Sequence, residues 1–245
     1  MNNKYIFNSK NYSRIPGCPF SYWVSESFIK PFDVGKTLGD VASVPKGLST
    51  GDVDRFMRFW YEISFLDIGF GCSSCLDSKT TKLKWFPYAK GGQFRRWNGN
   101  LYHVVNWLND GAEVKSFVDS KGKQRSRPQN TQFYFKECAT YSAITSNKYA
   151  VRYLNNSIFG GGGDSIHYSG KIFEIMGFLN SVVAQNYLNV ISPTLNFEVD
   201  HIKRLPIVDI SNNRIDELVK ISIEESKEDW DSFEESWDFK KHPLV

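Results

Sequence analysis

The amino-acid sequence predicts an α+β fold: a twisted, mostly antiparallel sheet with long loops, one long packed helix and an acidic helical tail. Between residues 36 and 160, glycine, proline or Asn-Gly turns separate short runs of β-prone residues, which is typical of antiparallel strands joined by loops. Apolar residues then recur at three- and four-residue spacing over 171–188, which predicts a helix with one buried face. Acidic residues are concentrated in the last thirty positions.

These patterns divide the chain into three segments. Residues 1–35 are expected to form an N-terminal linker, in which Tyr22–Phe32 can make a short amphipathic helix. Residues 36–210 are expected to form the main domain. Residues 211–245 are expected to form the tail, with a helix over about 215–226. The tail also carries aromatic rings among its carboxylates, and we expect them to dock on the body or on protein outside this chain: Trp230, Phe233, Trp237 and Phe239.

Within the main domain, strands are expected at Leu101–Val105 and Gln132–Phe135, with an exposed polar loop over 109–131. The run Gly160–Gly163 invites comparison with a phosphate-binding loop. No Gly-Lys-Ser/Thr follows it, so we interpret it as a flexible turn. The expected long helix at 171–188 has a stripe of residues predicted to be buried: Ile172, Ile175, Met176, Leu179, Val182, Val183 and Tyr187.

Charge is divided unevenly along the chain. Residues 216–245 hold ten carboxylates against four lysines, whereas residues 84–127 hold nine Lys and Arg against three acidic residues. A basic body followed by an acidic segment suits a domain that binds a polyanion. Runs of charge also occur as ordinary solvated faces, and that alternative stays open.

Composition and cysteine spacing exclude several classes of protein. A hydrophobic fraction of 41% with 16% aromatic residues is enough for a folded core. The sequence contains no run of 18 apolar residues and no apolar stretch of signal length after Met1, so we expect a soluble cytoplasmic protein with no membrane contact. Cys72 and Cys75 form a Cys-x-x-Cys with no second pair at zinc spacing, so free thiols are expected.

No self-contained active site is visible in the sequence. The four histidines are isolated from one another, without metal-binding spacing, and no Gly-x-Ser-x-Gly motif occurs. Glu198, Asp200 and Lys203 loosely resemble a nuclease cluster, but their spacing is wrong for one. We therefore expect no catalytic residue, metal or cofactor site in this chain.

Two segments combine glycines, basic residues and aromatic rings: Trp85–Asn100 and Lys46–Glu62. Glycine lets a backbone approach another surface closely, arginine can bind phosphates or a guanine edge, and aromatic rings can stack on bases. We predict a DNA-binding surface there. The alternative is an ordinary β-domain with aromatic residues in its core and glycines in its turns. The candidate DNA-binding residues are Thr50, Asp52, Arg55, Lys90, Gly91, Gly92, Arg95, Arg96 and Asn100.

An ordered set of motifs resembles the adenine-specific DNA methyltransferases of BREX phage-defence systems (the PglX type). The resemblance runs from about residue 13 to the end of the chain. The set as a whole is specific, although each motif alone would be weak. The motifs that carry it are Ile15–Ser25, Gly47–Phe56, Trp85–Asn100, Phe135–Ser142, Leu179–Ser181, Asn196–Ile207 and Asp229–Phe239.

The resemblance implies that this chain is the target-recognition region that follows the methyltransferase domain. The helix containing Leu179–Ser181 and the strand containing Leu205–Ile207 also resemble the specificity domains of type I restriction systems and of TaqI-like methyltransferases. The family's catalytic Asn-Pro-Pro-Tyr motif is missing, since the chain contains no Pro-Pro. S-adenosylmethionine is therefore expected in a catalytic domain outside this chain, and the implied partners are double-stranded DNA, that methyltransferase domain or subunit, and other BREX proteins.

The sequence departs from the family pattern at four positions. The pattern has Asn where Val53 and Ala89 stand, an aromatic residue at Asn98, and Gly at Cys138. If the Asn positions contact bases, the recognised DNA sequence differs or binding is weaker. A second function therefore stays open, in which a truncated, non-catalytic interaction protein binds defence-system partners through its aromatic acidic tail.

Overall fold

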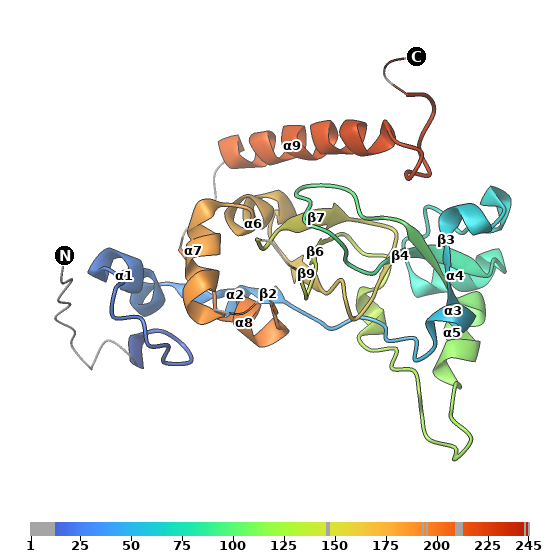
Figure 1. The fold of residues 1–245 in the computed structure, drawn as a ribbon, viewed down its shortest axis with the longest axis horizontal. Helices are drawn as coiled ribbons and strands as arrows, with labels where there is room; N and C mark the ends of the chain where they lie inside the picture. Colours follow the sequence, from blue (N-terminus) through green and yellow to red (C-terminus); the bar gives the residue numbers. More distant parts are fainter. Residues whose placement is uncertain are drawn as a thin grey trace.

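The computed structural model describes residues 13–145, 148–192, 194, 196–208, 213–242 and 244. Within these residues, helices and mostly antiparallel strands alternate along the chain (Figure 1), so the α+β class is confirmed. No helix in the described ranges is both long enough and apolar enough to cross a membrane. The α-helices are α1 Glu26–Val34, α2 Leu38–Val41, α3 Val53–Phe56, α4 Cys75–Thr81, α5 Leu108–Lys115, α6 Ile172–Leu179, α7 Val182–Ile191, α8 Val199–Lys203 and α9 Asn213–Asp231. The 3-10 turns are η2 Trp60–Glu62, η3 Phe65–Asp67 and η4 Thr131–Phe133.

The strands form two four-stranded sheets and one two-stranded ribbon. The central sheet has the order β2-β9-β6-β7, and the lateral sheet has the order β3-β5-β4-β8. All strand pairs in them are antiparallel except β4 with β8, which is parallel. The strands are β1 Lys36–Thr37, β2 Ala42–Ser43, β3 Met57–Phe59, β4 Trp85–Ala89, β5 His103–Asn106, β6 Cys138–Tyr141, β7 Val151–Leu154, β8 Ile158–Phe159, β9 Ser165–Tyr168 and β10 Pro206–Ile207. The ribbon pairs β1 with β10.

Each sheet supports its own core, and β6 and β7 contribute to both. Side chains alternate between the two faces of a strand. On β6, Ala139 and Tyr141 therefore pack with α6 and α7, while Cys138 packs with the lateral sheet. On β7, Val151 packs in the core of the central sheet and Leu154 in the core of the lateral sheet. The two cores are thus joined through one pair of strands, which fixes the loops of both sheets relative to each other.

The long helix predicted over 171–188 is interrupted, and its place is taken by α6 and α7. The Asn180 side chain forms two hydrogen bonds with the backbone of Val151, one accepted from its N–H (2.9 Å) and one donated to its carbonyl (3.0 Å). Ser181 then caps α7, because its hydroxyl accepts from the Ala184 N–H. Leu179 at the end of α6 is buried as predicted, with 1% exposed. Because α7 starts in a different phase, Val182 and Val183, also predicted to be buried, are 70% and 53% exposed.

Two further segments differ locally from the prediction. Residues 132–135 form no strand: η4 ends at Phe133, and Phe135 has a φ of 66°, which is incompatible with extended structure. The polar segment over 109–131 begins inside α5 and is a loop only after Lys115. The predicted turn at Gly160–Gly163 is confirmed, since the Gly163 N–H donates to the Gly160 carbonyl (2.9 Å). The strand expected at Leu101–Val105 is observed as β5.

The acidic tail lies along the body of the protein (Figure 1). Its helix, predicted at 215–226, is α9, which packs on α6, where Gly177 leaves room for Ile215. Trp230 is 3% exposed and meets Tyr102 edge to face at 5.0 Å. Trp237 packs against Phe70 at 5.3 Å. The expected docking of tail aromatics on the body is therefore confirmed for these two rings.

Candidate nucleic-acid interface

Three glycine-bearing segments that are distant in sequence lie side by side at one edge of the lateral sheet. The Leu48 N–H donates to the Phe159 carbonyl (2.9 Å), and the Gly160 N–H donates to the Ala89 carbonyl (2.8 Å). A Cβ on Gly91, which has a φ of 90°, would overlap the Gly162 carbonyl oxygen. The close backbone approach predicted for these glycines is thus made within the chain, and it holds the loops together.

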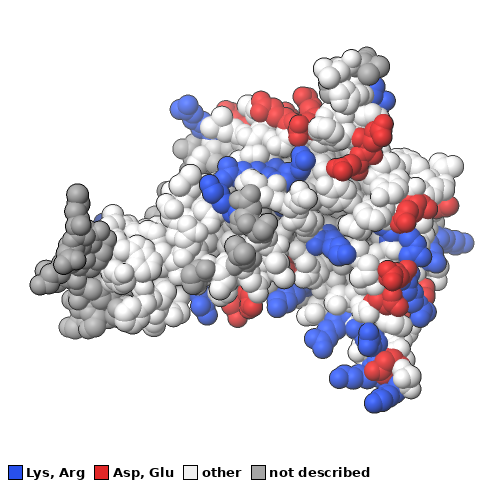
Figure 2. Space-filling model, viewed as in Figure 1, with Lys and Arg blue, Asp and Glu red and all other residues white. Residues whose placement is uncertain are grey.

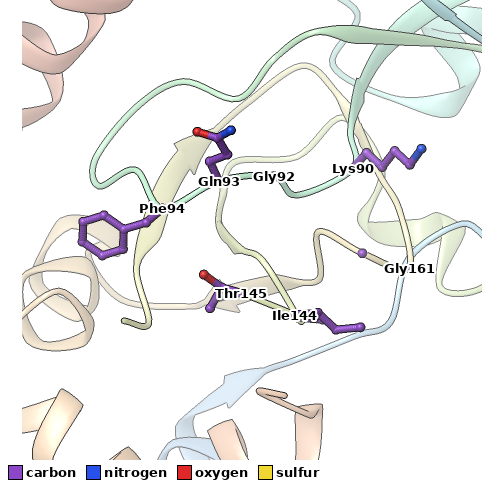
Figure 3. A pocket seen from close by; sticks show the side chains of 9 residues that line it. Lys90, Gly92, Gln93, Phe94, Ile144, Thr145 and Gly161 are labelled. Carbon is purple, nitrogen blue, oxygen red and sulfur yellow. The ribbon is translucent and has the colours of Figure 1, made fainter. Parts of the chain in front are cut away.

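A cavity of about 680 Å³ opens between the loops that these glycines hold. Lys90, Gln93 and Phe94 line it from the loop after β4, and Ile144 and Thr145 line it from the loop after β6; Figure 3 shows the Gln93 and Phe94 side chains directed away from Ile144 and Thr145. The lining contains one lysine, amide and hydroxyl groups, and exposed apolar side chains, but no carboxylate: Lys90, Gly92, Gln93, Phe94, Ala143, Ile144, Thr145, Gly161 and Gly162.

Lys90 also lines two neighbouring cavities of about 400 and 440 Å³. Both are bordered by Phe59 and His103, at the paired ends of β3 and β5. We call these three adjoining cavities the Lys90 groove. No ion pair joins Lys90 to a carboxylate within the described part of the chain, so its charge is available to a ligand.

A buried arginine supports the loop that carries Lys90. Arg152 of β7 is 2% exposed and donates to the Arg95 carbonyl (3.3 Å) and to the Ser142 hydroxyl (3.2 Å). The Ser142 hydroxyl in turn donates to the Gly92 carbonyl (2.9 Å). Burial lowers the pKa of Arg152 to about 10, so the guanidinium still carries a positive charge at neutral pH. That charge lies beneath the loop and favours an anion above it.

Sequence reasoning did not identify Arg152 or the second wall of the cavity. The only signal for Arg152 is a basic residue inside the apolar run Val151–Leu154. Ile144 and Thr145 gave no signal in the sequence, because a single isoleucine followed by a threonine is common in loops. Their position opposite Gln93 depends on the pairing of β6 with β7 and β9.

Of the two adjacent arginines in the loop after β4, Arg95 contacts the tail. Its guanidinium pairs with Asp229 (3.1 Å) and lies 4.9 Å from the centre of the Trp230 ring. Arg96 lies 5.6 Å from the Phe94 ring, and its Nε is buried without a partner. In this structure Arg95 is therefore paired with a carboxylate of the tail.

Among the other predicted residues, three are buried in this structure: Thr50, Gly91 and Asn100. The Asn100 side chain donates to the Gln93 carbonyl (2.8 Å) and so closes the loop after β4. Lys90 and Gly92 are exposed at the groove. Of the predicted residues, Lys90, Gly92, Arg95 and Arg96 thus lie together on the loop after β4, and Lys90 and Gly92 line the groove.

The remaining predicted residues belong to α3. Asp52 caps this helix by accepting from the Arg55 N–H (3.0 Å). The Arg55 guanidinium pairs with Glu113 (2.8 Å) and lies over the Phe56 and Phe117 rings. The helix borders the Lys90 groove through its neighbouring side chains Val53 and Asp54.

A second basic feature is the long loop after α5, which projects from the body (Figure 1). Figure 2 shows Lys and Arg side chains gathered at that end of the molecule. The base of the loop is fixed to the segment Lys46–Glu62, because Ser49 and Arg127 exchange two backbone hydrogen bonds of 3.1 and 2.7 Å. Its exposed basic residues are Lys121, Lys123, Arg125 and Arg127.

Three of the four positions that depart from the family pattern are buried. Ala89, Asn98 and Cys138 have little contact with solvent, whereas Val53 is exposed and lines the Lys90 groove. Only the change at Val53 therefore alters a surface that a ligand could reach. The cysteines carry no disulfide, and the described residues contain no cluster of three His, Cys, Asp or Glu suited to a metal.

No family model matches this sequence. The chain is similar over its whole length to "Adenine-specific methyltransferase PglX" of Lacticaseibacillus casei (strain Zhang), with 35% identity. It is also similar over 96% of its length to "Adenine-specific methyltransferase BrxX" of Escherichia coli O9:H4 (strain HS), with 34% identity. The chain covers 21% and 18% of these relatives, so it spans about a fifth of their length. The resemblance to PglX-type methyltransferases is therefore confirmed as sequence similarity between this chain and one part of these longer proteins.

Proposed function

We propose that this chain recognises a specific double-stranded DNA sequence on behalf of an adenine-specific methyltransferase of a BREX phage-defence system. The observation that carries the proposal is the Lys90 groove, in a chain whose homologues are adenine-specific methyltransferases. Loops held on a rigid pair of sheets are a common way to present binding residues. The groove is built from such loops and has a lysine at its centre.

The chemistry of the groove suits the edges and phosphates of DNA. Lys90 can bind a phosphate oxygen, and the Gln93 amide matches the donor and acceptor of an adenine edge. Phe94 and Ile144 offer apolar contact of the kind made with a thymine methyl group. Among the described residues, the lining of the first cavity includes no carboxylate, so the DNA backbone would lie there, whereas the other two cavities carry Asp54, Glu62 and Glu235.

Catalysis is assigned by this proposal to a methyltransferase domain or subunit outside the chain, where S-adenosylmethionine would also bind. An enzyme that modifies a base must hold it in a pocket outside the helix. The Asn-Pro-Pro-Tyr motif expected for that pocket is missing here, and in the run 160–163 Gly162 and Gly163 pack against the backbone of Lys90 and Gly91. A calorimetric titration of the purified chain with S-adenosylmethionine should therefore give no binding heat.

The second function, an interaction protein that binds defence-system partners through its tail, is less well supported. Trp230 and Trp237 already contact the same chain, and Glu235 accepts a hydrogen bond from the Trp60 indole at its backbone carbonyl (2.9 Å). Of the four tail rings, Phe233 is the one classed as exposed. A methyltransferase domain and other BREX proteins remain proposed partners through other surfaces.

The proposal is tested by the salt dependence of DNA binding. Fluorescence anisotropy with a labelled mixed-sequence duplex should give an affinity that falls as salt rises. Lys90→Ala should reduce the slope of log affinity against log salt by about one, because one phosphate contact is lost. The matched control is Lys30→Ala, an exposed lysine on α1, which should leave the slope unchanged.

A second variant distinguishes phosphate contacts from base contacts. Arg96→Ala should weaken binding by roughly 1–3 kcal/mol on a preferred sequence if Arg96 contacts a base, and should flatten the salt slope if it contacts a phosphate. Arg95 is less suitable, because its substitution would also disturb the docked tail. Unchanged affinity and slope in both Lys90→Ala and Arg96→Ala would contradict DNA binding at this groove.

A further inference from the structure

Three aromatic rings form a continuous stack beside Lys90. Phe59 and His103 are cross-strand partners on β3 and β5, and their rings stack at 4.8 Å with an angle of 28°. Tyr61 follows in η2 and stacks on Phe59 at 5.3 Å with an angle of 7°. We call these three rings the aromatic ledge.

The outer part of the aromatic ledge is open to solvent. Phe59 is 41% exposed and Tyr61 is 61% exposed. In the part of the chain that the structure describes, the other ring in contact with Tyr61 is Trp60, which meets it edge-on at 5.8 Å and 80°. Because Tyr61 is 61% exposed, part of its ring is open to a flat ligand, which would extend a stack that is already aligned.

The aromatic ledge separates two cavities that both contain Lys90 in their walls. Phe59 borders the cavities of about 400 and 440 Å³, and Tyr61 borders the larger one. Lys90 supplies a positive charge to both. Gln93 and Glu235 border the same cavity as Tyr61 and offer oxygens that can accept hydrogen bonds from the N–H groups of a base.

His103 completes the ledge as a neutral ring. Burial, and then the nearby Lys90, lower the pKa of His103 to about 4, so the imidazole is uncharged at neutral pH. The ledge is thus a flat stack of neutral rings, bordered by the Lys90 cation and by carboxylates that can accept hydrogen bonds from the N–H groups of a base: Asp54, Glu62 and Glu235. This combination fits a nucleobase attached to a phosphate.

We propose that the aromatic ledge binds one unpaired nucleobase of the DNA held in the Lys90 groove. A base within a paired duplex has both faces covered by its neighbours, so the open face of Tyr61 can stack only on a base outside the helix. Lys90 would contact the phosphate of that nucleotide. This inference rests on the proposed DNA binding and adds a second kind of contact, to an unpaired base.

The test uses 2-aminopurine, an adenine analogue whose fluorescence falls when it stacks. Two duplexes are compared, one with a single unpaired 2-aminopurine and one in which the same residue is paired. The wild-type chain should bind the unpaired form more tightly and reduce its fluorescence. Tyr61→Ala should weaken binding to the unpaired form by roughly 5- to 150-fold, the range expected for loss of one stacked base, and should leave the paired form unaffected.

Two further variants control for indirect effects. Tyr61→Phe keeps the ring and should keep both the preference and the loss of fluorescence. Phe65→Ala removes another exposed ring, which packs against Phe70 at 4.8 Å outside the ledge, and should change neither. Equal binding and equal quenching in wild type and Tyr61→Ala would overturn the inference.

The same titrations separate failure of this inference from failure of the proposed function. Binding to both duplexes without preference for the unpaired base overturns the aromatic ledge alone. Absence of binding to either duplex overturns the proposed function. In that case a short single strand containing 2-aminopurine still tests the ledge, because its bases are accessible without a duplex.

Discussion

Replacing Trp230 with alanine should detach the tail from the body. The ring is 3% exposed, meets Tyr102 edge to face at 5.0 Å, and is covered by the Arg95 guanidinium at 4.9 Å. Gly99 lies beneath it, where a Cβ would come within 3.1 Å of the indole. The substitution therefore removes a ring that is enclosed by Tyr102, Arg95 and Gly99.

The size of the effect follows from these contacts. Truncation of a buried tryptophan or phenylalanine typically costs about 3–5 kcal/mol. The cation–π contact with Arg95 adds less than about 1 kcal/mol, because the arginine is partly exposed. The Arg95–Asp229 ion pair is also exposed and contributes little. We therefore expect the free energy of unfolding to fall by about 3–5 kcal/mol, nearly all of it from packing.

Urea denaturation followed by far-ultraviolet circular dichroism measures this change without depending on tryptophan fluorescence. The matched control is Phe233→Ala, three residues along the same tail, where the ring is 48% exposed. Its cost should stay within about 0.5 kcal/mol. If Trp230→Ala cost less than about 1 kcal/mol, or no more than Phe233→Ala, the tail would not be held by this ring and its docked position would be wrong.

Two further predictions concern the core and pH. Leu179→Asp should destabilise severely because it buries an unpaired charge, whereas Val183→Asp should leave the melting temperature nearly unchanged. Lowering the pH from about 6.5 to about 4 should reduce stability, because burial lowers the pKa of both His103 and His167 to about 4, so that the folded state binds fewer protons than the unfolded state. Burial raises the pKa of Asp164 to about 6, which opposes this trend. Replacing both histidines with glutamine should therefore reduce the fall in melting temperature between about pH 6.5 and pH 4.

The sequence by itself determined those features that depend on local pattern. Turn residues between short β-prone runs predicted the mostly antiparallel sheets, and the charge and spacing of the tail predicted α9 and the docking of Trp230. These predictions hold because helix and strand periodicity express which side chains must leave water. The resemblance to PglX-type methyltransferases also came from ordered local motifs.

Tertiary structure decided what depends on partners far along the chain. The break between α6 and α7 is made by Asn180, which bonds to the backbone of Val151 on a neighbouring strand. Gly91 appeared suited to contact DNA, yet its bare backbone faces Gly162. The Lys90 groove and its support by Arg152 exist because sheet pairing brings separate loops together. A sequence motif specifies the residue types at a site, but strand register decides which of them face a ligand and which hold the loops in place.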